Sequence, residues 1–443
     1  MISTTVNILS IIFFSVNLIS DAQLSLTTSN TIEQNDRIEI VIAKDGTGNY
    51  TSIQAAIDGI DNKVFINVYI LVKNGTYNEK LFITKSNITI VGEDRYKTQI
   101  VFAELRSNWR KDHNDKDWGS AVINIADKVS NITIANLTVY NNYGSLYGSN
   151  NHQFAIRGHD ADKIILINCD IKADGGDTVS LWNPEYGKYY HYNSYFEGYV
   201  DFVCPRGWCY ITDSKFYQRS SSASASIWHD GSLNEDSKFV IKNSYFDGVP
   251  EFVLGRNHRD GQFFIIDCKF SANMKDKKMF LAPSDPERVF KWGERYYFYN
   301  SHRETGDFDW HSDNLETANG SPNPEILNAE WTFSTAPESW NPELSLNYIL
   351  PFAELPSPER NAYVNFSDSL LLSWAAAKDA DSYDIYFGET YPPEFKLNQT
   401  QNSFVVYDLK PESKYYWRVN TISKNDTLNS ETWSFSTKNI SDR

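Results

Sequence analysis

The sequence has few cysteines for its length, and acidic residues outnumber basic ones. Four cysteines in 443 residues cannot form the dense disulfide framework of a small secreted domain. No CxxC pair or His-rich spacing is present, so the sequence predicts no metal site. Lys and Arg number 41 against 57 acidic residues, and the net charge of −16 argues against nucleic acid or an anionic membrane surface as a partner.

Long apolar runs are missing beyond the N-terminus. Residues 8–19 form an apolar stretch that is short for a bilayer span, and small or polar residues follow it up to Ala22. This pattern predicts a signal peptide over residues 1–22, although its start lacks Lys and Arg. We therefore expect a secreted or periplasmic protein without a membrane span.

A short repeated unit runs through the middle of the chain. It reads apolar-x-apolar-x-Asn/Asp-x-x-apolar, and its polar centres stand 20 to 33 residues apart. Alternating apolar residues at this period predict an all-β fold, a parallel β-helix in which each coil buries its inner side chains against the next. We place this domain over residues 38–320, with a short helix near residues 51–58 at one end. The polar centres are Asn136, Asn168, Asn193, Asp213, Asn243, Asp267 and Asn300.

Two aspartates occupy matching places in successive coils. Asp177 follows Asn168 by nine residues, and Asp201 follows Asn193 by eight. Because strands of neighbouring coils lie about 4.8 Å apart, the two carboxylates should lie side by side on one outer face. Such a pair cannot easily ionise twice, so one member is expected to keep its proton near neutral pH. Taken alone, Asp177 would more often be a turn residue, whereas Asp201 stands between apolar neighbours and must face a groove or a partner.

The cysteines fall into two pairs with different surroundings. Cys169 and Cys268 follow the polar centres of their coils, where other coils have serine, which predicts small buried residues in an internal stack. Cys204 and Cys209 flank a tight link between coils. The sequence leaves open whether these two form a disulfide in an oxidising compartment.

Six short motifs stand in the order found in pectin methylesterases. Residues 40–315 therefore resemble the pectin methylesterase (pectinesterase) family, whose fold is a right-handed parallel β-helix. The resemblance implies a hydrolase that removes methyl esters from galacturonate residues of pectin without a cofactor. The motifs are DGTGNYTSIQAAI at 45–57, NGTYNE at 74–79, HQFAIR at 152–157, GDT at 176–178, DFV at 201–203 and LGR at 254–256.

The resemblance also implies a role for each matching residue. Asp201 corresponds to the nucleophile that attacks the ester carbonyl and forms a covalent acyl-enzyme. Asp177 corresponds to the general acid that protonates departing methanol and then, as a base, activates water. Arg256 matches the arginine that hydrogen-bonds the nucleophile and keeps it ionised. Gln153 matches a glutamine that stabilises the tetrahedral oxyanion.

The sequence departs from the family pattern at two places, immediately before Asp177 and immediately after Arg256. Gly176 stands where the family has Gln before the acid, and losing one oxyanion donor can cost about 10²–10³ in rate. A backbone N–H at Gly176, or the side chain of His229 or Arg206, could replace it. Asn257 and His258 stand where the family has Pro and a sugar-stacking aromatic residue. We expect other side chains to contact the substrate, namely Trp182, Trp208, Trp228, His229, His258 and Arg206.

The pattern changes after residue 320. Pro and Asn punctuate residues 321–355, which we interpret as a linker. Residues 356–438 hold short alternating strands typical of an immunoglobulin-like β-sandwich. The run LKPESKYYW at 409–417 looks like the tyrosine corner of fibronectin type III domains. We expect this module to be a spacer or a binding accessory without catalysis.

Other functions on the same architecture stay open at this point. A polysaccharide lyase would need a calcium-binding acidic cluster and a Lys or Arg base. An inverting glycosidase would need carboxylates about 6.5–9.5 Å apart. A carbohydrate-binding β-helix with a decayed catalytic set is a third class, which the missing glutamine keeps open. In each case the expected partner is a pectic polysaccharide or oligosaccharide, bound by a monomer.

Overall fold

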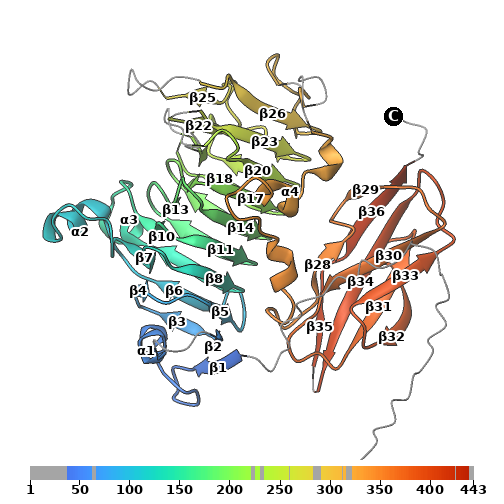
Figure 1. Cartoon of the computed structure of the whole chain (residues 1–443), viewed down its shortest axis with the longest axis horizontal. Coiled ribbons are helices and arrows are strands. Elements are labelled where there is room, and N and C mark those ends of the chain that lie inside the picture. The colour runs from blue at the N-terminus through green and yellow to red at the C-terminus, as the bar shows by residue number, and fades with distance from the viewer. Residues whose placement is uncertain are drawn as a thin grey trace, which may run out of the picture. The chain divides into compact units, whose positions relative to one another are not determined.

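The computed structural model describes residues 37–61, 66–220, 225–229, 234–258, 260–282, 291–311, 313–315, 322–424 and 426–438. The predicted signal peptide lies outside these residues. Within them, no helix is long and apolar enough to cross a membrane. Three parallel sheets come first along the chain, and two largely antiparallel sheets follow (Figure 1).

The parallel sheets are the three walls of a β-helix, and each complete coil contributes one strand to each wall. In sheet A the strands are β1 (Arg37–Ile42), β2 (Asn67–Val72), β5 (Ile88–Gly92), β8 (Ser130–Ala135), β11 (Asp162–Ile167), β14 (Lys188–Tyr192), β17 (Trp208–Thr212), β20 (Phe239–Lys242), β23 (Gln262–Ile266) and β26 (Arg295–Tyr299). In sheet B they are β3 (Gly75–Tyr77), β6 (Thr98–Val101), β9 (Thr138–Asn141), β12 (Asp170–Ala173), β15 (Tyr195–Gly198), β18 (Lys215–Gln218), β21 (Tyr245–Gly248), β24 (Lys269–Phe270) and β27 (His302–Arg303). In sheet C they are β4 (Leu81–Ile83), β7 (Ala121–Ile125), β10 (Phe154–His159), β13 (Val179–Trp182), β16 (Val203–Arg206), β19 (Ile227–Trp228), β22 (Gly255–Asn257) and β25 (Phe280–Leu281).

Asparagine and aspartate turn the chain from sheet A into sheet B. The seven polar centres of the repeat all have left-handed backbone conformations, with φ between 43° and 53°. Asn and Asp adopt this conformation at lower cost than other residues with a side chain. Their side chains also join successive coils: Asn168 Nδ2 donates to Asn136 Oδ1 at 2.8 Å, and Asn193 Nδ2 donates to Asn168 Oδ1 at 3.2 Å. The predicted parallel β-helix is therefore confirmed, with its repeat explained by these corners.

Aromatic rings form part of the interior of the β-helix. Phe196, Phe216, Phe246 and Phe270 lie above one another in sheet B, with ring centroids 5.4, 4.3 and 5.5 Å apart. All four are buried, so their apolar area contributes to stability. Much of the aromatic content of this chain therefore serves packing.

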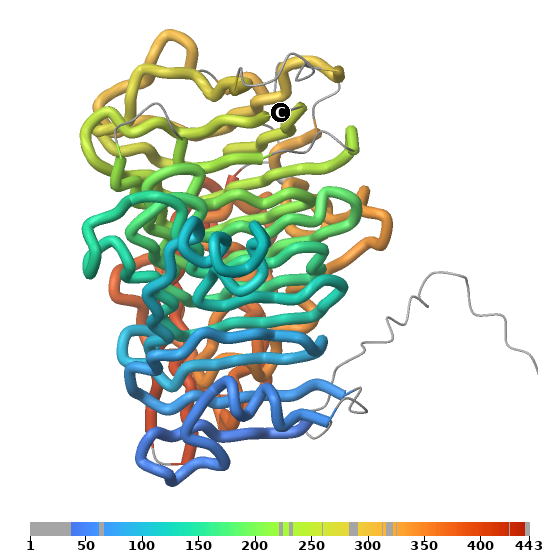
Figure 2. Tube along the Cα trace, turned by 90° about the vertical axis from the view of Figure 1, so that its left-hand side faces the viewer, coloured from blue at the N-terminus to red at the C-terminus, as the bar shows by residue number. Residues whose placement is uncertain are grey.

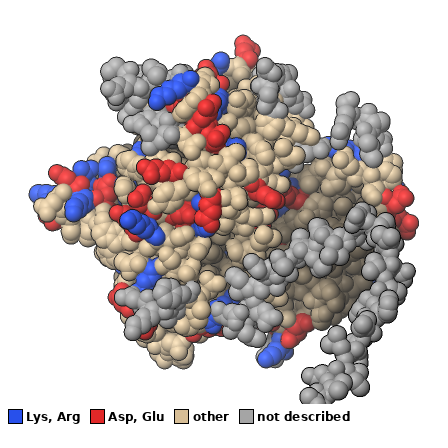
Figure 3. Space-filling model, viewed as in Figure 1, with Lys and Arg blue, Asp and Glu red and all other residues tan. Residues whose placement is uncertain are grey.

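Three short helices lie on the first half of the β-helix. Helix α1 (Ile53–Gly59) confirms the helix predicted near residues 51–58, and its N-cap is Ser52, whose side chain accepts from Ala55 N. Helix α2 (Arg106–Asp112) lies within a charged insertion, and α3 (Tyr143–Tyr147) lies in the loop before β10. Figure 2 shows the coils stacked in chain order, with α2 in front of them. Figure 3 shows basic and acidic side chains gathered at the edge where α2 lies.

The segment interpreted as a linker packs on the β-helix. It contains η1 (Pro324–Ile326), α4 (Ala329–Phe333) and η2 (Pro342–Ser345). Phe333 joins a buried cluster with the outward-facing side chains of sheet A, among them Trp208 and Tyr210. This segment therefore covers part of sheet A.

The C-terminal module consists of two sheets around a core of its own. Trp374, Trp417 and Trp433 are buried between them. One sheet contains β28 (Glu354–Ser357), β30 (Ser369–Ala375) and β33 (Ser403–Tyr407). The other contains β29 (Ala362–Asn365), β36 (Trp433–Lys438), β34 (Lys414–Ser423), β31 (Ser382–Gly388), β32 (Glu394–Gln399) and β35 (Asp426–Asn429).

All four cysteines are free thiols in the structure. Cys169 and Cys268 lie in the interior, as the repeat predicts. Cys209 also belongs to the interior cluster, whereas the Sγ of Cys204 donates to Val179 O at 3.2 Å. Cys204 and Cys209 therefore form no disulfide in this structure. They lie on strands of different sheets, β16 and β17.

Candidate active site

Asp177 and Asp201 lie at equivalent corners of adjacent coils. Asp177 precedes β13 by two residues and Asp201 precedes β16 by two, and these strands are neighbours in sheet C. Both residues have left-handed backbones, with φ of 59° and 44°. Asp177 N donates to Val200 O at 2.8 Å, which ties the two corners together. The aspartates are therefore suited to the turn as well as to chemistry.

Arg256 holds the Asp201 carboxylate from strand β22, two coils further along. Its Nε donates to Oδ1 at 3.0 Å and to Oδ2 at 3.1 Å, and its Nη2 donates to Oδ2 at 2.5 Å. Asp201 is 4% exposed, so this contact is shielded from water. Fork-like contacts of this kind fix a carboxylate in orientation and favour its ionised form.

The two carboxyls differ in their hydrogen-bond partners. Burial raises the pKa of Asp177 to about 6, against the opposing effect of nearby guanidinium groups. Burial also raises the pKa of Asp201 to about 6, while the hydrogen bonds from Arg256 act to lower it and the Asp177 charge acts to raise it. Because Arg256 bonds directly to Asp201, the proton that the pair shares is best held by Asp177.

The Asp177→Asn variant is expected to be more stable than the parent at pH 8. The raised pKa means that folded Asp177 binds its proton more tightly than the unfolded chain does. Its contribution to stability is therefore full below about pH 4 and is lost as the pH rises through about 6. The free energy of unfolding should differ by about 1–3 kcal/mol at pH 8 and by little at pH 4. Denaturant midpoints at the two pH values measure this difference. Asp112→Asn, on exposed α2, is the control, and an equal gap at both pH values would contradict the expectation.

Basic groups surround Asp177 although the chain as a whole is acidic. Arg157, Arg106, Arg206 and Arg256 all act on its carboxyl as positive charges. The local field is therefore favourable for an anionic sugar, which the net charge of −16 would otherwise repel.

Two of these arginines are braced by one aspartate. Arg106 Nε and Nη2 donate to Asp117 at 2.8 and 3.0 Å, and Arg157 Nη2 donates to the same carboxylate at 2.9 Å. Arg157 is 7% exposed and also bonds Ser180 Oγ. These contacts join the insertion that carries α2 to sheet C beside the carboxyl pair.

A stack of aromatic rings around Arg206 lies on the same sheet. The Arg206 guanidinium carbon is 3.4 Å from the centroid of the Trp182 ring and 4.1 Å from that of Trp228. His258 meets Trp228 edge-on, with centroids 4.6 Å apart. The structure thus brings together four of the residues predicted to contact substrate.

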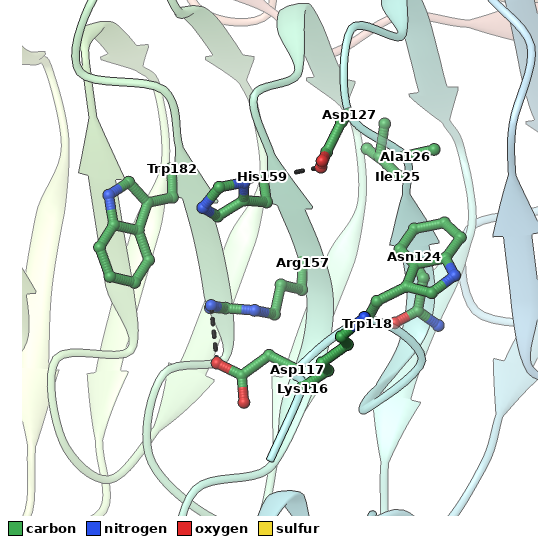
Figure 4. Close-up of a pocket in the computed structure, with 10 residues that line it drawn as sticks. All are labelled: Lys116, Asp117, Trp118, Asn124, Ile125, Ala126, Asp127, Arg157, His159 and Trp182. Atoms are coloured by element: carbon green, nitrogen blue, oxygen red, sulfur yellow. Dashed lines mark hydrogen bonds and ion pairs between the residues drawn. The ribbon is translucent and has the colours of Figure 1, made fainter. Parts of the chain in front are cut away.

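A cleft of about 710 Å³ opens beside this stack (Figure 4). Trp182 and Trp118 stand on opposite sides of it, and His159 and Arg157 lie between them. His159 pairs with Asp127 at 3.5 Å. Aromatic faces and a guanidinium in one cleft are suited to a sugar ring that carries a carboxylate.

Three predicted site residues, Trp208, His229 and Gln153, lie away from the open face. Trp208 is fully buried beneath the segment that contains α4, where its Nε1 donates to Thr335 Oγ1 at 3.1 Å. His229 is also fully buried and packs edge-on against Phe239 and Phe263 in the interior. The predictions that these two residues contact substrate are wrong, because their strands turn them away from the open face.

The Gln153 amide is also turned away from the open face. The residue is fully buried. Its Oε1 accepts from Gly144 N at 2.9 Å, and its Nε2 donates to Ser149 O at 2.7 Å. Its amide holds the loop that carries α3, so in this arrangement it is not available to an ester. The neighbouring His152, which begins the HQFAIR motif, points its ring at Asp177 instead, with Nε2 3.7 Å from Oδ2.

Among the described residues, no group of three or more His, Cys, Asp or Glu side chains could hold a metal ion. Comparison with known proteins places part of the chain in a family. The pectinesterase family model matches residues 39–259. Residues 39–259 belong to the pectinesterase family. Pectinesterase QRT1 of Arabidopsis thaliana is 25% identical over 228 residues, which are 50% of this chain and 58% of that protein. A pectinesterase of Aspergillus aculeatus is 27% identical over 235 residues, 49% of this chain and 67% of that protein.

The similarity covers part of each protein. The chain spans about half the length of the first curated relatives it matches, 47% and 58%. Among solved structures, pectin methylesterase PemA from Erwinia chrysanthemi aligns with 70% of this chain and 98% of its own, at 18% identity and a TM-score of 0.50. This structural likeness supports the β-helix fold.

Proposed function

We propose that this protein is a carboxylic-ester hydrolase that removes methyl esters from galacturonate residues of pectin or pectic fragments. The observation that supports this most directly is the Asp201 carboxylate, held by three hydrogen bonds from Arg256 next to the Asp177 corner. One carboxyl is oriented and ionised as a nucleophile, and the other is poised to keep a proton. The family match of residues 39–259 points to the same chemistry.

The reaction follows from these two states. An Asp201 oxygen attacks the ester carbonyl carbon, and the π electrons of the carbonyl move to its oxygen. The tetrahedral intermediate collapses with loss of the methoxy group, which leaves as methanol after Asp177 donates its proton. Asp177, now ionised, takes a proton from water, and the resulting hydroxide attacks the acyl-enzyme. The products are the galacturonic acid group and the regenerated Asp201 carboxylate.

The Arg206 stack is the proposed contact for the sugar chain. Trp182 offers an apolar ring face and the Arg206 guanidinium offers positive charge to an unesterified galacturonate, while the buried Trp228 ring supports the guanidinium from its other side. His258 adds a polar edge beside Trp228. We propose that these side chains replace the aromatic residue that the family has after Leu-Gly-Arg.

The product of the reaction tests the proposed function. Purified protein is incubated with methylated pectin, and methanol, unsaturated ends absorbing in the ultraviolet, and new reducing ends are measured together. Methanol alone is the expected result. Unsaturated ends would identify a lyase, and reducing ends a glycosidase. Binding without any product would identify a carbohydrate-binding protein and contradict the proposal.

Replacing Arg206 with Ala should weaken substrate binding more than it slows the chemistry. Loss of a stacked guanidinium is worth about 1–2 kcal/mol, so KM for partly de-esterified pectin should rise about 5- to 30-fold. The increase should be smaller with fully methylated pectin, which presents no free carboxylate. Arg206→Lys retains the charge without the planar stack and should give an intermediate KM. Equal KM increases with both substrates would contradict a contact with the carboxylate.

The regions outside the β-helix add two smaller proposals. The Tyr415 hydroxyl accepts from Lys410 N at 2.7 Å, a contact of the tyrosine-corner type. We assign the C-terminal module as fibronectin type III-like on this basis, with a role as a spacer or binding accessory. The apolar stretch at 8–19 supports export to the cell exterior or periplasm.

A further inference from the structure

The proposed ester hydrolysis needs a hydrogen-bond donor that neither family position supplies here. Gly176 has no side chain, and the Gln153 amide is fully buried and bonded to the loop that carries α3. The carbonyl oxygen becomes negatively charged in the tetrahedral intermediate. Losing one hydrogen-bond donor to this oxyanion slows acyl transfer by about 10²–10³-fold. Another group on this face must therefore meet it.

The His152 ring occupies the space next to Gly176. A Cβ placed on Gly176 would lie 3.2 Å from Val200 O, 3.3 Å from Val200 Cβ and 3.8 Å from His152 Cδ2, so a longer side chain at this position would crowd Val200 as well as meet the ring. The side chain is 49% exposed and its Nε2 lies 3.7 Å from Asp177 Oδ2. It lines a second cleft together with Arg106, Arg110 and Asn151. The imidazole thus combines access from solvent with closeness to the acid.

The electrostatic surroundings favour a neutral imidazole with an N–H to donate. Burial lowers the pKa of His152, and the Arg106 charge lowers it further, while Asp201 and Asp117 oppose this shift. Asp177 Oδ2 lies 3.7 Å from Nε2, beyond hydrogen-bond distance, so an Nε2–H is left to donate to another acceptor. A neutral ring donates a hydrogen bond without giving up its proton, which is what an oxyanion requires.

We propose that His152 takes the place of the missing glutamine and donates its Nε2–H to the oxyanion of the tetrahedral intermediate. This inference rests on the proposed function, because it concerns the same ester. As Asp201 forms its bond to the carbonyl carbon, the electron pair of the carbonyl moves to oxygen, and His152 stabilises that charge. When methanol leaves with the proton of Asp177, the carbonyl re-forms and the hydrogen bond weakens. His152 is regenerated unchanged.

The test compares loss of the imidazole with return of a glutamine at position 176. His152→Ala should lower kcat by about 10²-fold and change KM little. Adding Gly176→Gln to this variant should raise its kcat at least about tenfold, because the glutamine amide enters the space that the imidazole has left. The double variant with Gly176→Ala, which adds a Cβ without an amide, should restore nothing. His302→Ala, in sheet B, is the control for removal of a partly exposed histidine.

Three results would overturn the proposal. The first is a kcat within twofold of the parent for His152→Ala. The second is a double variant that stays as slow as His152→Ala although Gly176→Gln alone is as active as the parent. The glutamine amide would then fit at position 176, and a missing donor would not explain the loss. The third is a shift in the basic limb of the pH profile of His152→Ala, which would identify a residue that positions Asp177. If the parent itself releases no methanol, the proposed function fails before this question arises.

Discussion

Replacing Asp201 with Asn should lower kcat for methanol release by about 10⁴-fold or more. The amide has no ionised oxygen with which to attack the ester, so the covalent path through Asp201 is lost. A 10⁴-fold loss corresponds to about 5.5 kcal/mol in the activation barrier. The fold should persist, because the amide oxygen still accepts from Arg256 and Asn is suited to the left-handed corner at φ 44°. Methanol release at saturating methylated pectin measures the effect.

The matched control for this variant is Asp267→Asn. Asp267 also sits at a left-handed corner, with φ of 51°, but between sheets A and B, where it accepts from Asn300 Nδ2 at 2.7 Å. Its substitution should leave methanol release unchanged. If Asp201→Asn kept more than a few per cent of the parent activity while binding pectin normally, Asp201 would not be the nucleophile.

The second largest effect is expected from Arg256→Ala. Removing a charged partner that orients a reacting group costs about 10²–10³ in kcat. The loss also has a pH signature. The guanidinium favours ionised Asp201, so without it the pKa of that carboxyl rises further. The acidic limb of the pH–rate profile should therefore move to higher pH, with apparent values that belong to the carboxyl pair.

Arg256→Lys separates charge from geometry. Lysine keeps the positive charge but cannot form the fork of hydrogen bonds. The acidic limb of the pH–rate profile should therefore stay close to that of the parent, while kcat stays reduced. Arg303→Ala, in sheet B, is a control for loss of an arginine outside the site. An acidic limb that stayed in place or moved to lower pH in Arg256→Ala would show that Arg256 does not hold the nucleophile ionised.

The repeat could be predicted because its signal is local. Each coil needs an Asn or Asp at one corner and apolar residues at alternate positions before it, and both requirements appear within eight residues of sequence. Asp177 and Asp201 follow the polar centres of their coils by nine and eight residues, so their placement on adjacent coils could be counted along the chain. Arg256 could be found only by resemblance, because it reaches Asp201 across two coils.

The predictions that were wrong concern which way a side chain faces. Trp208 and Trp228 both lie at an end of a short strand, Trp208 at the start of β17 and Trp228 at the end of β19. Trp208 is covered by the segment around α4, more than a hundred residues away in sequence, whereas Trp228 packs on Arg206. His229 follows Trp228 directly and so points the opposite way, into the interior.

The amino-acid sequence alone determined the coil period, its polar corners and the placement of two acidic side chains on adjacent coils. The physical reason is that backbone conformation and side-chain alternation depend on near neighbours. Only the tertiary structure decided which polar groups reach the open face, since burial depends on distant segments. In the tertiary structure the Gln153 amide bonds the loop that carries α3, and the His152 ring lies beside Asp177.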